Sequence, residues 1–133
     1  NHVDNAIRID PATGVQIRTD LSAKLFLSDP EDYDGGELTI EGAFGSASYK
    51  LAAGQLLLYP STSVHHVTPI TRGERISSFF WIESLVRENE AREMLFDLDQ
   101  SIQHLTVDRG AADAEVLRLT QIYHNLIRRW AKR

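Results

Sequence analysis

The chain has 133 residues and a mass of 15.0 kDa, which is typical of one compact domain or of a small domain with an appendage. Its composition, with 42% hydrophobic and 25% charged residues, is not that of a disordered segment. Nineteen acidic against 14 basic residues give a net charge of −5, the opposite sign to a nucleic-acid-binding surface. No apolar run approaches the roughly 18 residues that span a bilayer, and the absence of cysteine excludes disulfides, thiolate metal sites and a cysteine nucleophile.

The chain up to residue 83 has the pattern of an antiparallel β-structure. Short runs rich in β-forming residues alternate with turn signals, which include an acidic Pro/Gly turn at 29–36 and a Thr-Arg-Gly turn at 71–73. We expect about seven strands, at 2–8, 18–27, 37–41, 47–51, 55–59, 64–68 and 74–82. This spacing favours a barrel or a jelly-roll sandwich.

From Ser84 onward the pattern becomes helical. Ser84 is the expected cap of a first helix whose apolar positions are Leu95, Leu98, Ile102 and Leu105. A second helix carries an apolar stripe that ends at Trp130. We expect a helical hairpin that docks against the barrel or against a second subunit, which gives an organisation of 1–83 and 84–133.

The start of the chain is unusual for a natural protein. It begins Asn1-His2-Val3-Asp4, and its only methionine is Met94. We expect the sequence to be the C-terminal portion of a longer chain, with upstream strands missing.

His2 and Asp4 share one face if this segment is extended, because successive side chains alternate along a strand. A His-x-Asp pair with a distant histidine has the spacing of the facial triad that holds Fe(II) and leaves three coordination positions open. The distant histidine is His65 or His66, of which only one can point inward. A polar strand end is the alternative interpretation of His-x-Asp.

Arg75 lies at the start of the last strand, on the same face as Ser77, Phe79 and Trp81. A buried guanidinium needs an anionic partner. The distal carboxylate of 2-oxoglutarate would be such a partner for Arg75, with Ser77 as a second donor. Alternatively, Arg75 pairs with Glu83 or Glu37, or lies exposed at the strand end. Arg72 is the competing arginine, but its turn favours a solvent-facing position.

Several segments resemble the PKHD-type hydroxylases, which are bacterial Fe(II)/2-oxoglutarate-dependent dioxygenases related to the prolyl 4-hydroxylases. These segments are HVDNAIR, RTDLSAKLFLSDPEDYDGGELTI, LAAGQLLLYPSTSVHHVTPITRGERISSFFWIES, MLFDLDQSIQ and YHNLIRRW, and they run through nearly the whole chain. The resemblance implies a mainly β fold with a double-stranded β-helix (jelly-roll) core, here lacking its N-terminal part, followed by a C-terminal α-helical extension.

The resemblance also implies roles for particular residues. It makes His2, Asp4 and His65 the iron ligands, with His65 preferred to His66, and makes Arg75 the residue that binds 2-oxoglutarate, with Ser77 beside it. Ascorbate is implied as the reductant that rescues oxidised iron. The expected partners are the small cosubstrate and an unidentified substrate, with no nucleic acid, no membrane and a homo-oligomer formed through the C-terminal helices. The expected location is the bacterial cytoplasm.

Two other functions compete with hydroxylation. One is a non-catalytic jelly-roll module that binds a ligand or metal without turnover. The other is a hydrolase in which the same triad holds Zn²⁺, although the sequence offers no obvious general base. His104 and His124 lie on the expected helices without ligand-spaced partners and are interpreted as surface or packing residues.

Overall fold

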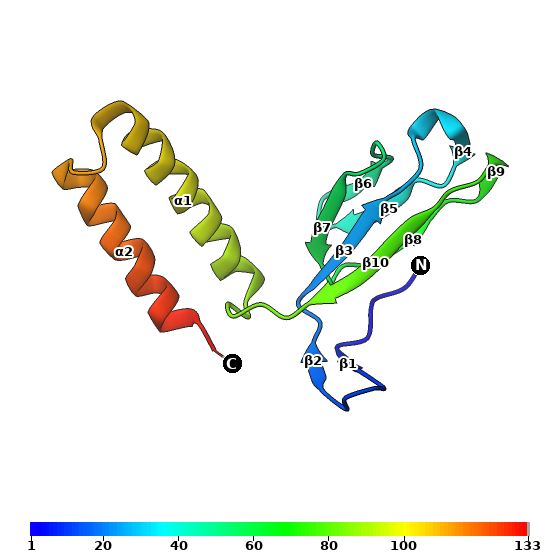
Figure 1. The fold of residues 1–133 in the computed structure, drawn as a ribbon, viewed down its shortest axis with the longest axis horizontal. Coiled ribbons are helices and arrows are strands. Elements are labelled where there is room, and N and C mark those ends of the chain that lie inside the picture. The colour runs from blue at the N-terminus through cyan, green and yellow to red at the C-terminus, as the bar shows by residue number, and fades with distance from the viewer. Residues whose placement is uncertain (133) are drawn as a thin grey trace. The chain divides into compact units, whose positions relative to one another are not determined.

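The computed structural model describes residues 1–132 and consists of two compact units, Asn1–Glu83 and Ser84–Arg133. The first unit is built from short antiparallel strands and the second from two helices (Figure 1). The predicted order of a β-rich part followed by two helices is therefore confirmed.

The first unit contains four small sheets. Their orders are β1-β2, β10-β3-β7, β4-β9 and β6-β5-β8, and every pairing is antiparallel. The strands are β1 (Ile7–Ile9), β2 (Gln16–Arg18), β3 (Leu21–Phe26), β4 (Tyr33–Gly35), β5 (Leu38–Gly42), β6 (Gly45–Tyr49), β7 (Leu56–Pro60), β8 (His65–Val67), β9 (Ile70–Gly73) and β10 (Ser77–Ile82), with a 3-10 turn at Pro30–Asp32.

The pairing of β3 with β10 decides which side chains share a face. Ser22 lies opposite Trp81, Lys24 opposite Phe79, and Phe26 opposite Ser77. The side chains of directly paired residues in an antiparallel sheet point to the same face, and so do side chains two positions apart on one strand. One face of this sheet therefore carries alternating polar and aromatic side chains from both strands.

Two of the predicted strands differ in the structure. Residues 2–8 do not form one strand: His2 makes an isolated bridge to His65, and β1 begins only at Ile7. The turn after β1 was not predicted; in it Asp10 accepts hydrogen bonds from the Ala12 amide and the Thr13 hydroxyl. This turn folds β1 back onto β2, so that the expected strand at 18–27 is divided between β2 and β3.

The expected turn at 71–73 is also wrong, because these residues belong to β9, which pairs with β4. Gly73 has a φ of +75° and packs directly on the neighbouring backbone: a Cβ added there would lie 2.1 Å from the Asp32 carbonyl oxygen. Glycine is therefore required at position 73 by the close approach of β9 to the neighbouring backbone, and not by a turn. Beside this contact the core contains the fully buried Tyr33, Phe26 and Leu38.

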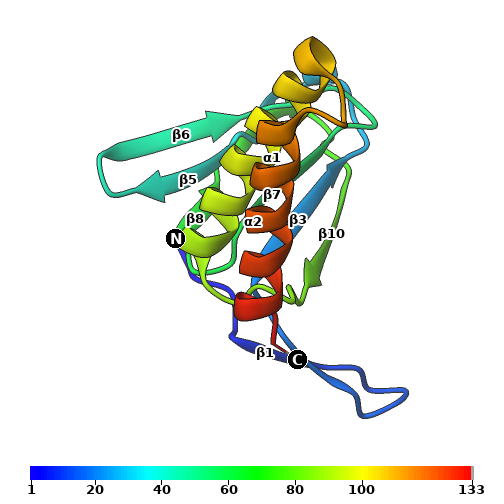
Figure 2. The ribbon, with the colours of Figure 1, turned by 90° about the vertical axis from the view of Figure 1, so that its left-hand side faces the viewer.

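The second unit is an antiparallel helical pair, α1 (Asn89–Arg109) and α2 (Ala114–Trp130), which run side by side in Figure 2. Its core joins Val86, Ala91 and Leu95 to the apolar stripe of α2, namely Tyr123, Leu126, Ile127 and Trp130. Neither helix combines the length and the apolar character that crossing a bilayer requires.

The expected cap of the first helix is wrong. Ser84 lies five residues before α1, where its hydroxyl accepts a hydrogen bond from the Val86 amide, and Glu88 at the N-cap provides no side-chain bond. Asp113 caps α2 instead, accepting from the amides of Glu115 and Val116.

Candidate metal centre

Three side chains converge at one end of the first unit. A nitrogen or oxygen atom from each of His2, Asp4 and His65 lies within 4.8 Å of the others, and no second group of this kind exists in residues 1–132. Asp4 Oδ1 is 3.5 Å from His2 Nε2 and 3.7 Å from His65 Nε2. Adjacent ligands bound at about 2.1 Å to one octahedral metal are about 3.0 Å apart. The observed cluster is wider than that, with its ligand atoms within 4.8 Å of one another.

Backbone pairing holds the two histidines together. The amide of His2 donates to the His65 carbonyl at 3.0 Å, and the amide of His65 donates to the His2 carbonyl at 2.9 Å. The imidazole rings lie 4.2 Å apart between centroids. His66 does not join the cluster, since alternation along β8 directs it to the opposite side from His65.

The Asp4 carboxylate is oriented by hydrogen bonds to one of its two oxygens. Oδ2 accepts from the Ser22 hydroxyl at 2.6 Å and from the Trp81 indole at 3.0 Å. Burial raises the pKa of Asp4, but the bonds from Ser22 and Trp81, together with His65 and His2 nearby, outweigh it and hold this pKa below its ordinary value. Asp4 is therefore an anion whose other oxygen, Oδ1, faces both histidines.

The imidazole of His65 is oriented in a similar way. Its Nδ1 lies 3.1 Å from the Ser63 carbonyl oxygen, so a proton on Nδ1 is donated there. Nε2 then keeps its lone pair on the side of Asp4, which is the arrangement that a metal-binding histidine needs. The His65 side chain is only 5% exposed, whereas that of His2 is 63% exposed. The cluster thus has one open side.

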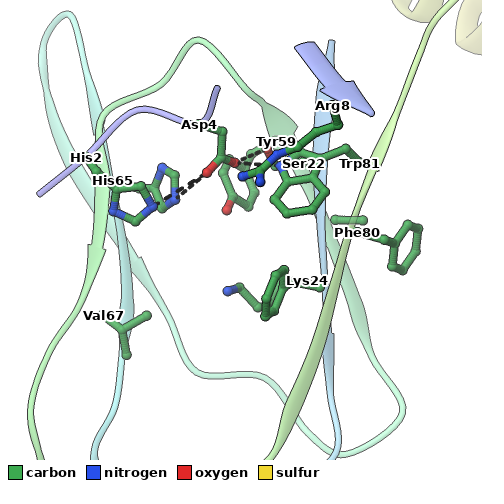
Figure 3. A pocket seen from close by; sticks show the side chains of 12 residues that line it. His2, Asp4, Arg8, Ser22, Lys24, Tyr59, His65, Val67, Phe80 and Trp81 are labelled. Atoms are coloured by element: carbon green, nitrogen blue, oxygen red, sulfur yellow. Dashed lines mark hydrogen bonds and ion pairs between the residues drawn. The ribbon is translucent and has the colours of Figure 1, made fainter. Parts of the chain in front are cut away.

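The cluster opens into a cavity of about 440 Å³ lined by residues of β3, β7, β8 and β10 (Figure 3). The sequence placed Phe79 and Trp81 on one face but did not identify seven other lining residues, which are Arg8, Ser22, Ala23, Lys24, Tyr59, Val67 and Phe80. The position of Ser22 opposite Trp81 depends on the register of β3 against β10, which no sequence motif encodes.

Ser77 is the first residue of β10, and Arg75, which was expected inside this strand, lies two residues before it; neither residue is among those that line the cavity. Arg75 Nη1 donates to the Ser77 hydroxyl at 3.3 Å. The Nε and Nη2 atoms of Arg75 are buried and have no hydrogen-bond partner. Arg75 forms no ion pair among residues 1–132, so neither Glu83 nor Glu37 is its partner. Glu83 instead accepts a hydrogen bond from the Arg18 amide. Arg72, as expected, is exposed, and it pairs with Asp34 at 2.8 Å.

Tyr33 adds a third buried, unpaired polar atom, its hydroxyl. The Tyr33 ring and the Arg75 side chain meet at Gly36, where an added Cβ would lie 3.0 Å from Tyr33 Cε2 and 2.9 Å from Arg75 Cδ. Buried donors without partners are rare in folded proteins, because each costs about 1–3 kcal/mol. Their concentration here indicates a place for an acceptor group.

Lys24, half-buried on β3, lines the cavity and interacts electrostatically with both Arg75 and Asp4. Burial lowers the pKa of Lys24, as does the positive charge of Arg75, while Asp4 acts in the opposite direction. The amine lies 5.1 Å from the centroid of the Phe79 ring. His104 and His124, by contrast, are exposed on α1 and α2, and they contribute nothing to the cluster.

Comparison with known proteins identifies relatives of both units. Residues 1–83 match the model of the 2OG-Fe(II) oxygenase superfamily, and residues 89–132 match that of the PKHD-type hydroxylase C-terminal domain. A PKHD-type hydroxylase of Rhizorhabdus wittichii is 59% identical over 131 residues, which cover 98% of this chain and 58% of the relative. A PKHD-type hydroxylase of Methylobacillus flagellatus is 61% identical over 130 residues, which cover 98% of this chain and 57% of the relative. The chain thus spans somewhat more than half the length of these curated relatives.

Proposed function

Because the chain belongs to the 2OG-Fe(II) oxygenase superfamily and carries a PKHD-type hydroxylase C-terminal domain, we propose that it couples the oxidative decarboxylation of 2-oxoglutarate to the hydroxylation of a substrate. The observation that carries this proposal is the convergence of His2, Asp4 and His65 at the mouth of a cavity. Two neutral imidazoles and one carboxylate are the donor set that suits a non-haem Fe(II) ion.

The residues of the first unit also suit the cosubstrate. Arg75 Nε and Nη2 are buried donors without partners, and the Ser77 hydroxyl and the nearby Tyr33 hydroxyl extend the polar surface. A carboxylate is the planar acceptor that matches the guanidinium fork. We assign the distal carboxylate of 2-oxoglutarate to Arg75 and Ser77, and its keto-acid end to the metal side of the cavity.

The chain's own groups then have distinct tasks. Asp4 presents Oδ1 to the metal while Ser22 and Trp81 hold its other oxygen, and Ser63 fixes the orientation of His65. Such supporting bonds strengthen and orient metal ligands. When bound, Fe(II) and 2-oxoglutarate would supply the activation of O₂ that converts a substrate C–H bond to C–OH, with CO₂ and succinate as the other products.

The finer expectations stay predictions. They are closure of the strands into a double-stranded β-helix, use of ascorbate as reductant, association of copies through the helices of 84–133, and a cytoplasmic location. Of the competing functions, the hydrolase would work without O₂, and the non-catalytic module would bind metal without consuming 2-oxoglutarate.

The test is an anaerobic titration with Fe(II) and then with 2-oxoglutarate, monitored by the visible charge-transfer band of a metal-chelated keto acid. His65→Ala should abolish the band, while His66→Ala, which removes the adjacent imidazole on the other side of β8, should keep it. Arg75→Ala should shift the band to much higher 2-oxoglutarate concentration with little change in Fe(II) affinity, and Arg72→Ala should leave both unchanged.

Three results would contradict the proposal. They are a band that survives His65→Ala, equal loss of metal and keto-acid binding in Arg75→Ala, and product formation at an undiminished rate without O₂. The first would reject the ligand set, the second the cosubstrate site, and the third would favour the hydrolase.

A further inference from the structure

An arginine that lines the cavity has no role in the proposed function. Arg8 lines the same cavity as His2 and Asp4, and its guanidinium carbon lies 3.9 Å from the centroid of the Trp81 ring (Figure 3). Its Nε is buried without a hydrogen-bond partner, and Arg8 forms no ion pair within residues 1–132. An arginine is always charged, so this cation is held in place without an anion.

Trp81 connects Arg8 to the metal-binding cluster. Its indole nitrogen donates to Asp4 Oδ2 at 3.0 Å, while its ring face carries the guanidinium. Because the indole is held by Asp4, the guanidinium over its ring is held beside the cluster, and its unpartnered Nε is available to an acceptor. A group bound there would lie beside the cluster and not at Arg75, which precedes the first residue of β10 by two positions, whereas Trp81 is near its end.

The balance of charge indicates the sign of that group. Asp4 is the only acidic residue among those that line the cavity, whereas Arg8 and Lys24 are both cationic. The charges of a divalent metal, the Asp4 carboxylate, a dianionic 2-oxoglutarate and Arg75 would sum to zero, which leaves the charges of Arg8 and Lys24 unmatched. Unmatched charges in a partly desolvated cavity favour an anionic ligand.

We propose that the substrate to be hydroxylated carries a carboxylate, and that Arg8, stacked on Trp81, binds it. This inference rests on the proposed function. Arg8 is thus a positioning residue that sets substrate specificity. Arg8 lines the cavity beside the metal-binding cluster and Arg75 does not, so the substrate carboxylate and the distal carboxylate of the cosubstrate would each meet a different arginine.

The experiment uses the 133-residue chain saturated with Zn²⁺ and 2-oxoglutarate, so that neither the metal nor Arg75 is free to capture a probe. Matched pairs of small acids and their amides, benzoate with benzamide and hexanoate with hexanamide, are titrated by saturation-transfer NMR. The affinities for Zn²⁺ and 2-oxoglutarate are measured by calorimetry on the same samples. Wild-type protein should bind each acid about tenfold or more tightly than its amide, as a charge-assisted bond predicts.

Arg8→Gln should reduce that ratio to about one while keeping the affinities for Zn²⁺ and 2-oxoglutarate within about twofold, and Arg8→Lys should retain part of the preference. Arg118→Gln, which removes an exposed charge on α2, is the matched control and should change nothing. Thermal melting of each variant verifies that it is folded.

Binding of Zn²⁺ and 2-oxoglutarate without any preference for the acids would overturn this inference and leave the proposed function intact. A preference that persists in folded Arg8→Gln, or that Lys24→Gln removes instead, would also overturn it. If wild-type protein bound neither Zn²⁺ nor 2-oxoglutarate, the proposed function would fail, and this inference with it.

Discussion

Replacing Arg75 by methionine should change stability and cosubstrate binding in opposite directions. Arg75 Nε and Nη2 are buried and unpaired, so each donor costs the protein without cosubstrate about 1–3 kcal/mol. Methionine keeps most of the aliphatic volume that contacts Gly36 and removes both donors. After allowance for imperfect packing, the free energy of unfolding of Arg75→Met should rise by about 1 kcal/mol.

The same substitution removes two charge-assisted hydrogen bonds to the distal carboxylate. At about 1.5 kcal/mol each, their loss should weaken 2-oxoglutarate binding on the order of 100-fold. Urea unfolding of the protein without ligands measures the first effect, and calorimetric titration of the Zn²⁺-loaded protein measures the second. Arg72→Met is the matched control: its ion pair with Asp34 is exposed, so stability should fall by less than about 1 kcal/mol and 2-oxoglutarate affinity should not change.

A fall of about 3–5 kcal/mol in the stability of Arg75→Met would refute this reasoning. That magnitude is the cost of leaving one partner of a buried ion pair uncompensated. It would mean that Arg75 already has an anionic partner within the protein and that no acceptor is needed from outside.

Three further substitutions test separate parts of the structure. Ser22→Ala should lower Zn²⁺ affinity about tenfold by releasing Asp4 Oδ2, and an unchanged affinity on calorimetry would exclude this supporting role. Gly73→Ala should destabilise the first unit by several kcal/mol in urea unfolding, because a Cβ there meets backbone at positive φ, whereas Gly45→Ala meets no atom within 4 Å and should cost clearly less. Asp113→Ala should destabilise the helical unit by about 1 kcal/mol through loss of the α2 cap, and an unaltered circular-dichroism melt would contradict that.

The sequence predicts local features better than it predicts which strands meet. The apolar stripe of α2 depends only on the period of the helix, and the structure has it; Arg75, by contrast, contacts Ser77 but lies outside β10. The expected single strand at 2–8 is wrong because His2 bridges to His65 while Ile7–Ile9 pairs with β2, and the expected turn at 71–73 is wrong because these residues pair with β4.

The side-chain contacts around the candidate metal centre could not be predicted from the sequence either. Ser22 and Trp81 meet on Asp4 because β3 pairs with β10, and these residues are 59 positions apart along the chain, the difference between 81 and 22. Pairing between such distant segments depends on the packing of the whole unit, which a single sequence does not display. The stacking of Arg8 on Trp81 depends on the same pairing.

The convergence of distant segments on Asp4 has a consequence for folding. The donor atoms and their supporting bonds come from the first residues of the chain, from β3, from β8 and from β10, so they come together only when the whole first unit is formed. A metal ion that binds there acts as a ligand of the native state alone, and at 100 times its dissociation constant it adds about 2.7 kcal/mol to the free energy of unfolding. The helical unit has its own core and supplies no ligand. The stability that a bound metal adds therefore comes from contacts within the first unit alone.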